Sequence, residues 1–276
     1  MKKHIRMVGV DLDGTLLTTT KELTEYTRET LKKAIAQGCE VLVATGRPLT
    51  GVPQEFLNLP GVKYAVASNG TRIVNVETKE IIYESLLSVE TAEQVLDIVS
   101  DYDASQEVVL DGQGYTKAEC LRNVKHYWKS SGMQEYILTT RIPVEDVKAF
   151  LLGTNRPVDK VNSVFCNMDE YREAVERVKQ IPGIEITGSE PNIMEVNVAG
   201  VSKGTALIKM GEILGIKRED IMACGDGMND YIMLQEVGLG VAMGNADERL
   251  KAVADYVTDT NDNEGVAKAF EQFVIK

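Results

Sequence analysis

The chain has 276 residues, which is enough for one large or two modest domains, and its 43% apolar residues are typical of a folded globular protein. The formal net charge of −12 argues against nucleic acid and anionic membranes as partners, although a local cluster of donors can still hold a small anion. Four scattered cysteines, and a short N-terminal apolar run that ends in two aspartates, indicate neither disulfides nor a signal or membrane segment, so we expect a cytoplasmic protein.

The first third of the chain alternates between buried-strand and helix patterns. Apolar runs predict strands, Gly38 marks the end of one helix, and Pro48 suits the first turn of another. The predicted elements are strands 5–10, 40–44 and 64–68, helices 24–37 and 48–58, and a hairpin that joins 71–76 to 80–83.

The last third repeats this alternation. Its predicted elements are strands 193–198, 220–224, 239–243 and 256–258, and helices 203–214, 229–237, 247–252 and 265–273. Strands that alternate with helices in this way predict an α/β fold whose core is a Rossmann-like, doubly wound parallel sheet covered on both faces.

The middle of the chain, residues 86–190, shows a different pattern and contains none of the motifs described below. Its predicted elements are helices 92–102, 118–129, 144–152 and 169–180, and strands 107–110, 161–167 and 184–187. We interpret it as a separate α/β domain inserted into a core formed by residues 1–85 and 191–276.

The strongest motif is Asp11-Leu12-Asp13-Gly14-Thr15, at the end of the first predicted strand. Side chains two residues apart in extended chain point the same way, so Asp11 and Asp13 are aimed into the crevice where open α/β sheets bind ligands. Two adjacent carboxylates need a cation between them, and oxygen-only ligands suit Mg²⁺. The alternative is a polar strand-to-loop junction, because Asp, Gly and Thr are common turn residues.

Two weaker motifs suggest anion binding. Thr45 and Gly46 follow the second predicted strand and precede a helix, where a hydroxyl and an N–H group can hold an anion; a simple capped helix start is the alternative. Lys203 follows the expected N-cap Ser202, and a cation there is unfavourable to the helix dipole. Its position suggests an external partner such as a phosphate, although a solvated lysine remains possible.

The fourth motif is Gly225-Asp226-Gly227-Met228-Asn229-Asp230, after a buried strand. Asp226, Asn229 and Asp230 are spaced to share one face as a helix begins, which suits metal binding. A Gly-rich turn with capping acids is the alternative. Since the chain has only two histidines, His4 and His126, acid–base chemistry falls mainly to carboxylates, and we assign neither histidine a function.

In this order, the motifs resemble those of the haloacid dehalogenase-like superfamily, and specifically its Cof-type sugar-phosphatase subgroup. The resemblance is carried by the motifs DLDGTL at 11–16, ATGRP at 44–48, SNG at 68–70, VSKG at 201–204, GDGMND at 225–230, GLGVAMGNA at 238–246 and TDTNDNEGVA at 258–267. Asp13 and Thr45 are separated by only one helix and one strand, and the insertion comes later. That position resembles a type IIB cap domain.

The resemblance implies roles for these residues. Asp11 is the expected nucleophile that becomes an aspartyl phosphate, and Asp13 the acid–base residue. The expected magnesium ligands are Asp11, Asp13 through its backbone carbonyl, and Asp226. The expected phosphate-binding groups are the Leu12 N–H, Thr45, the Gly46 N–H, Lys203 and Asn229. Asp230 is expected to orient a metal-bound water or the Lys203 ammonium.

We therefore expect a Mg²⁺-dependent phosphoric monoester hydrolase that acts on a small phosphorylated metabolite, such as a sugar phosphate. The cap would select the leaving group, and Asp111, Gln113 and Tyr115 are candidate cap residues in a predicted loop, although a surface turn is the simpler interpretation. Two alternatives stay open: a phosphomutase of the same fold, and a non-catalytic sensor of a phosphorylated ligand. The second carboxylate argues against the sensor.

Overall fold

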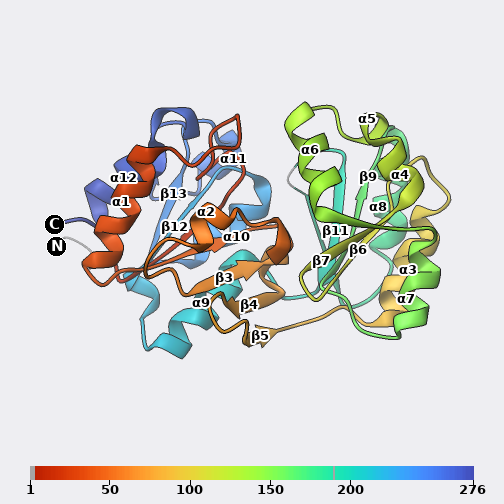
Figure 1. Ribbon diagram of the computed structural model, residues 1–276, viewed down its shortest axis with the longest axis horizontal. Coiled ribbons are helices and arrows are strands. Elements are labelled where there is room, and N and C mark those ends of the chain that lie inside the picture. Colours follow the sequence, from red (N-terminus) through yellow and green to blue (C-terminus); the bar gives the residue numbers. More distant parts are fainter. Residues whose placement is uncertain (1–3, 189) are drawn as a thin grey trace. The chain divides into compact units, whose positions relative to one another are not determined.

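The computed structural model describes residues 4–188 and 190–276, which form two compact units (Figure 1). The core unit contains the described residues up to Gly46, Val52–Tyr83 and Ser202–Lys276. The cap unit contains Arg47–Gly51 and the described part of Glu84–Val201. No helix in 4–188 or 190–276 is long and apolar enough to cross a membrane.

The core unit is built on an eight-stranded sheet with the order β14-β13-β12-β1-β2-β3-β4-β5. Its strands are β1 (Met7–Val10), β2 (Glu40–Ala44), β3 (Tyr64–Ala67), β4 (Arg72–Asn75), β5 (Ile81–Glu84), β12 (Ile221–Gly225), β13 (Leu239–Ala242) and β14 (Tyr256–Val257). The six strands from β14 to β3 in this order pair in parallel, and β4 pairs antiparallel to β3. This arrangement confirms the predicted α/β core.

The order of the strands fixes where a ligand can bind. From β1 the chain proceeds to β2 on one side, whereas β12, on the other side of β1, leads to β13 in the opposite direction. Right-handed crossovers in opposite directions put helices on both faces, which explains why β1 and β12 are buried along their full length. The crevice at the carboxyl ends of β1 and β12 is thus the topological switch point of the sheet.

Three core helices lie where the sequence pattern predicts them: α1 (Glu25–Ala36), α9 (Lys203–Leu214) and α12 (Gly265–Phe273). Thr24 caps α1, and Ser202 caps α9 by accepting a hydrogen bond from the Thr205 N–H. The other core elements are α2 (Gln54–Leu57), α10 (Tyr231–Glu236), α11 (Glu248–Lys251), and the short 3₁₀ turns η2 (Ser68–Gly70), η3 (Arg218–Asp220), η4 (Met228–Asp230) and η5 (Asn261–Asn263).

The prediction of one helix over 48–58 is wrong. The chain forms the 3₁₀ turn η1 (Leu49–Gly51) and then the short helix α2, with Pro53 at the N-cap of α2. Proline lacks an N–H group and disfavours helical geometry in the residue before it, so Pro53 ends the first turn and starts a new helix.

The cap unit contains a six-stranded sheet with the order β10-β11-β9-β6-β7-β8. Its strands are β6 (Glu107–Leu110), β7 (Gln113–Lys117), β8 (Arg141–Val144), β9 (Lys160–Val164), β10 (Ile184–Thr187) and β11 (Ile193–Val198), and its helices are α3 (Val89–Val99), α4 (Ala118–Arg122), α5 (Val124–Tyr127), α6 (Ser131–Thr140), α7 (Val147–Thr154) and α8 (Met168–Val178). One face of the sheet packs against α3, α7 and α8 through a continuous apolar core.

The predicted end of the insertion at residue 190 is too early. Strand β11, expected in the core, pairs antiparallel with both β9 and β10, and the cap unit continues to Val201. Its alternation of apolar and polar residues, with Glu195 and Asn197 between apolar neighbours, is typical of an antiparallel strand with two different faces.

Three further elements of the cap unit were not predicted: β7, α6 and β8. Gln113 and Tyr115 were assigned to a loop, but they lie in β7 and alternate with buried Gly114 and Thr116. The predicted helix 118–129 is divided at Asn123 into α4 and α5. Strands β7 and β8 are short, and their registers depend on the pairing of β7 with β6 and of β8 with β7, so local pattern was a weak guide.

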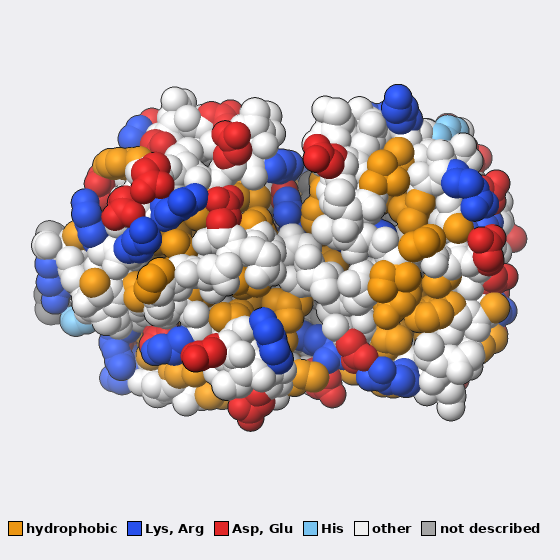
Figure 2. Space-filling view, viewed as in Figure 1, with side chains coloured by type: hydrophobic (Ala, Val, Ile, Leu, Met, Phe, Trp, Pro, Cys, Tyr) orange, Lys and Arg blue, Asp and Glu red, His pale blue; other side chains and the backbone are white. Residues whose placement is uncertain are grey.

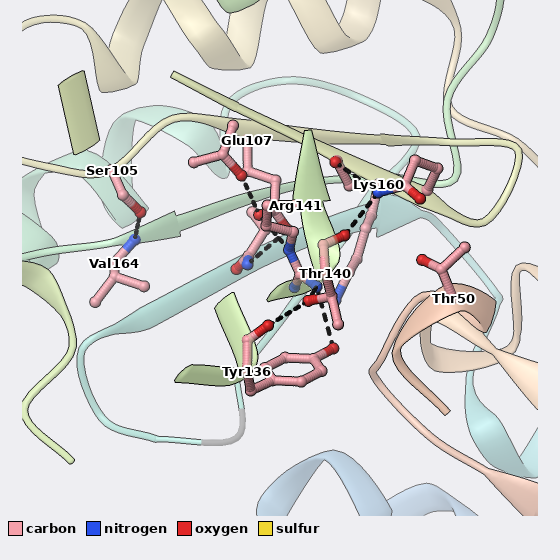
Figure 3. A network of polar contacts seen from close by, with 12 residues as sticks. Thr50, Ser105, Glu107, Tyr136, Thr140, Arg141, Lys160 and Val164 are labelled. Carbon is pink, nitrogen blue, oxygen red and sulfur yellow. Dashed lines mark hydrogen bonds and ion pairs between the residues drawn. The ribbon is translucent and has the colours of Figure 1, made fainter. Parts of the chain in front are cut away.

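The second face of the cap sheet is polar but buried (Figure 3). Arg141 Nε donates to Glu107 Oε2 at 2.7 Å, and both side chains are almost fully buried. Thr116 also donates to Glu107, and Lys160 forms an ion pair with Glu195 on the neighbouring strand. Desolvation of Glu107 would raise its pKa, but the Arg141 guanidinium and the hydrogen bonds outweigh it and lower that pKa.

We expect Arg141→Met to destabilise the cap unit by about 3–5 kcal/mol at neutral pH, because it leaves Glu107 buried without its cation. Urea unfolding followed by fluorescence measures this, since Trp128 is the single tryptophan and lies buried in the cap. The Glu107 pKa is lowered by folding, so the difference from wild type should shrink as pH falls below about 4. Arg156→Met, at an exposed ion pair with Asp111, is the control and should cost less than about 1 kcal/mol. Equal costs for the two variants would contradict this account.

Candidate active site

The candidate nucleophile Asp11 directly follows β1. Its N–H donates to the Cys224 carbonyl at 3.0 Å, so the pairing of β1 with β12 continues to the point where both strands end. Only 6% of Asp11 is exposed. Asp11 and the loop after Gly225 thus lie on either side of the switch point.

Lys203 connects the two sides of this crevice. Its Nζ donates to Asp11 Oδ1 at 2.7 Å and to Asp230 Oδ1 at 2.8 Å, and the Lys203 and Asp230 side chains are fully buried. The cation at the start of α9 is therefore offset by two carboxylates of the chain itself. Its position 192 residues after Asp11 hides this contact from any local motif.

Asp230 organises the loop after β12. Its Oδ2 accepts hydrogen bonds from the N–H groups of Asp226 and Gly227, at 3.0 and 3.1 Å, while Oδ1 holds Lys203. That Asp230 orients Lys203, one of the two roles expected for it, stays a prediction. The first turn after Gly227 is the 3₁₀ turn η4 rather than α-helix, and this turn brings Asp230 back toward Asp226.

Asp226 is fixed by two neighbours. Thr15 Oγ1 donates to Asp226 Oδ1 at 2.9 Å, and Gly14 has φ = +78°. A Cβ atom on Gly14 would lie 2.3 Å from Asp226 Oδ2, so glycine is required both for the backbone conformation and for the approach of the carboxylate.

The carboxylates of Asp11, Asp226 and Asp230 form a compact acidic cluster, with one oxygen from each lying within 4.8 Å of the others. Burial raises the pKa of Asp11 well above its usual value, and the charges of Asp230 and Asp226 add to this, against the opposing effect of Lys203. Burial, and then Asp230, raise the pKa of Asp226 to about 6. Desolvation would lower the pKa of Lys203, but Asp11 and Asp230 raise it, so Lys203 stays charged.

These residues fit a magnesium ion. The donors are all carboxylate oxygens, which Mg²⁺ prefers, and Gly14 leaves open the space that any side chain would fill at Asp226. Burial is the main cause of the raised pKa values of Asp11 and Asp226, and the charges of neighbouring carboxylates add to it. One lysine does not neutralise three clustered carboxylates, which leaves an excess of negative charge. A divalent cation would remove it.

Asp13 has a charged partner that the sequence analysis missed. Lys21 Nζ donates to Asp13 Oδ1 at 2.6 Å, and both side chains are about one third exposed. Lys21 has φ = +67° and closes a turn in which its N–H donates to the Thr18 carbonyl. Lys21 lies eight positions after Asp13, across irregular chain, so no periodicity could reveal the pair.

The candidate phosphate-binding residues lie at the same edge of the core sheet. Thr45 is buried and continues β2: its N–H donates to the Val66 carbonyl, and its own carbonyl accepts the Asn69 N–H. Leu12 follows Asp11, Gly46 follows Thr45, and Asn229 lies in η4. Since β1, β2 and β12 are parallel neighbours, their carboxyl ends place these residues along one side of the sheet.

The loop after β13 contacts the backbone of two site loops. The sequence analysis gave this loop no role in the site. Asn245 Nδ2 donates to the Gly14 carbonyl at 2.8 Å, and the Asp247 N–H donates to the Asp226 carbonyl at 3.1 Å. The loop therefore holds both ends of the Gly14–Asp226 contact. The motif 238–246 contains Asn245, and Asp247 directly follows it, but only the pairing of β13 with β12 brings this loop to the site.

The three candidate cap residues differ in their surroundings. Asp111 is exposed and paired with Arg156, and Gln113 Nε2 donates to the Thr140 carbonyl at 2.7 Å. Tyr115 stacks on Phe150 among the helices that cover the apolar face of the cap sheet. None of the three lies on the polar face occupied by Glu107 and Arg141.

Comparison with known proteins identifies the family. The family model for haloacid dehalogenase-like hydrolases matches residues 8–270. The chain is 30% identical over 273 residues to the 5-amino-6-(5-phospho-D-ribitylamino)uracil phosphatase YcsE of Bacillus subtilis, covering 98% of this chain and 96% of that protein.

Two solved structures match along almost their whole length. The phosphatase BT1666 from Bacteroides thetaiotaomicron has a TM-score of 0.82 at 29% identity, covering 99% of this chain and 97% of its own. The subclass IIB sugar phosphatase BT4131 has a TM-score of 0.82 at 27% identity, covering 98% and 100%. The family that the motifs predicted is thus confirmed, and the chain belongs to the haloacid dehalogenase-like hydrolases.

Proposed function

We propose that this enzyme is a magnesium-dependent phosphoric monoester hydrolase that cleaves a small phosphorylated metabolite through a phosphorylated Asp11. The observation that carries the proposal is the buried group Asp11–Lys203–Asp230 beside Asp226, at the switch point of the core sheet. A buried carboxylate held by a lysine and faced by further carboxylates suits a nucleophile that works beside a divalent cation. The phosphatases among the relatives support the reaction class.

In the first step, an oxygen of Asp11 attacks phosphorus and the bond from phosphorus to the ester oxygen breaks. The leaving alkoxide takes a proton from Asp13. In the second step, water attacks the phosphorus of the aspartyl phosphate and gives a proton to Asp13. The bond between phosphorus and the Asp11 oxygen breaks, so that phosphate leaves and the Asp11 carboxylate is restored. Two moderate displacements replace one difficult hydrolysis.

The chain's own groups prepare this chemistry. Lys203 holds Oδ1 of Asp11, so that the other carboxylate oxygen can attack phosphorus. The ammonium of Lys203 can also stabilise the negative charge on the phosphoryl oxygens during transfer. Lys21 holds the Asp13 carboxylate in place as the acceptor for the proton of water. Asp11, Asp226 and the backbone carbonyl of Asp13 would hold Mg²⁺, which would offset the charge of the carboxylates and of the phosphate. Thr45, Asn229 and the N–H groups of Leu12 and Gly46 would bind the phosphoryl oxygens.

The substrate is proposed to be a sugar phosphate or a related polyol phosphate. YcsE is named for a phosphorylated ribitylamino compound, and BT4131 is described as a sugar phosphatase. Both names refer to phosphate esters of polyhydroxylated carbon chains. Such esters carry poor leaving groups, which is the case in which protonation by Asp13 matters most.

The test is phosphate release from p-nitrophenyl phosphate and from a panel of sugar and polyol phosphates, with Mg²⁺ and then with a chelator. We expect turnover that the chelator abolishes and that added Mg²⁺ restores. Turnover that survives chelation would contradict the magnesium requirement. Rearranged sugar phosphate without free phosphate would indicate a mutase, and thermal stabilisation by the panel without any turnover would indicate a sensor.

A further inference from the structure

A second group of side chains that could hold a metal ion lies in the cap unit. Asp103 follows α3, His126 lies in α5, and Cys166 follows β9. One potential ligand atom from each lies within 4.8 Å of the other two. Asp103 Oδ2 is 2.7 Å from His126 Nε2, and Cys166 Sγ is 3.6 Å from the His126 carbonyl oxygen.

Backbone contacts join two of these three segments, those of Asp103 and Cys166, and side-chain contacts tie His126 to both. The Cys166 N–H donates to the Asp103 carbonyl at 3.1 Å, and Ala104 forms an antiparallel bridge with Phe165. The Asp103 N–H in turn donates to the carboxylate of Glu170 in α8. Asp103 and Cys166 therefore lie on paired chain segments and His126 lies in a helix, which is the kind of support that a metal site needs.

The donor set differs in kind from that of the core site. A thiol, an imidazole and a carboxylate suit Zn²⁺ and chemically similar ions, whereas the oxygen-only cluster in the core suits Mg²⁺. We propose that Asp103, His126 and Cys166 bind one divalent transition-metal ion of the Zn²⁺ type, with a coordination position left for water.

Access and charge agree with this assignment. The side chains of His126 and Asp103 are 51% and 47% exposed, so an ion can enter from solvent without opening the fold. Glu170 adds a second carboxylate beside the site, and Lys129 donates to the His126 carbonyl. Bound metal would join the end of α3, α5 and the start of α8, and so clamp one end of the cap unit.

The test uses Co²⁺ as the probe, in excess Mg²⁺ to occupy the oxygen site and with a phosphine to keep thiols reduced. We expect one Co²⁺ per chain, with the near-ultraviolet charge-transfer band of a cobalt–thiolate bond and quenching of Trp128 fluorescence. Zn²⁺ should displace the Co²⁺. Cys166→Ser should abolish the charge-transfer band, and His126→Gln and Asp103→Asn should weaken binding about tenfold or more.

Matched controls are available in the chain. His4→Gln changes the only other histidine, and Asp101→Asn changes a nearby exposed carboxylate that pairs with Arg177; both should bind Co²⁺ as the wild type does. A second measurement needs no variant, because Cys166 is the one exposed cysteine of the four. Zn²⁺ should slow its alkylation, and Mg²⁺ should not.

The proposal is overturned if the wild type shows no thiolate band at millimolar Co²⁺, or if the band survives in Cys166→Ser. It is also overturned if Zn²⁺ and Mg²⁺ affect alkylation equally. In any of these cases Asp103 and His126 form an ion pair only, beside an ordinary thiol.

Discussion

Replacing Asp11 by Asn is expected to reduce phosphate release about 10⁴-fold or more, because the amide cannot attack phosphorus as a carboxylate does. The variant should fold. Burial and two neighbouring carboxylates raise the pKa of Asp11, which means that folding disfavours its charge, and Lys203 keeps Asp230 as a partner. We expect Asp11→Asn to be at least as stable as the wild type in the absence of Mg²⁺, as judged by thermal unfolding.

Asp13→Asn separates the two steps of the reaction. With p-nitrophenyl phosphate, whose leaving group needs little protonation, this variant should still transfer phosphate to Asp11 but hydrolyse the aspartyl phosphate slowly. Intact-protein mass spectrometry should then detect one added phosphate, which Asp11→Asn should never acquire. Wild-type turnover in Asp11→Asn, or a stable phosphate on that variant, would place the nucleophile elsewhere.

Replacing Lys203 by Met is the second change with a large expected effect, and it acts on both stability and activity. Without the ammonium, Asp11 and Asp230 remain buried with no cation between them. We expect the metal-free variant to lose about 3–5 kcal/mol of unfolding free energy. Turnover should fall about 10²- to 10³-fold even when Mg²⁺ restores part of the stability, because a fixed donor to the transferring phosphate is lost.

The pH dependence gives this prediction a further signature. A carboxylate whose pKa is raised by folding binds a proton more readily in the folded than in the unfolded chain. Its contribution to stability therefore declines as pH rises from its unfolded-state pKa to its folded-state pKa. Removal of Lys203 should therefore cost least in acid and most at neutral pH. Lys209→Met, on the exposed side of the same helix, is the control and should cost less than about 1 kcal/mol. A pH-independent cost, or equal costs for the two lysines, would show that Lys203 is not the counter-ion.

The two metal proposals can be examined separately. The core site contains only carboxylates and concerns the chemistry at phosphorus, whereas the cap site contains a thiol and an imidazole and concerns the stability of the cap unit. Cys166→Ser is therefore expected to leave the magnesium dependence of turnover unchanged. Failure of either proposal would leave the evidence for the other intact.

Local sequence determined most of the core and the chemistry at its strand ends. Buried parallel strands give continuous apolar runs, and caps such as Thr24 and Ser202 mark helix starts, because both signals arise from neighbouring residues. Asp11 and Asp226 could be placed for the same reason: each comes directly after such a run. The order of these motifs along the chain was sufficient to indicate the family.

Tertiary structure alone decided which charges meet. Lys203 and Asp11 are 192 residues apart, and Asp13 finds Lys21 through an irregular turn, so neither pair has a spacing that a sequence pattern can show. The pairing of β11 with β9 and β10 likewise moved the boundary of the cap, since strand partners are chosen by distant segments. Asp11 and Asp13 are the same residue type two positions apart, and the resemblance to the family gave them different roles. The fold then gives Asp11 a buried lysine and Asp13 a partly exposed one.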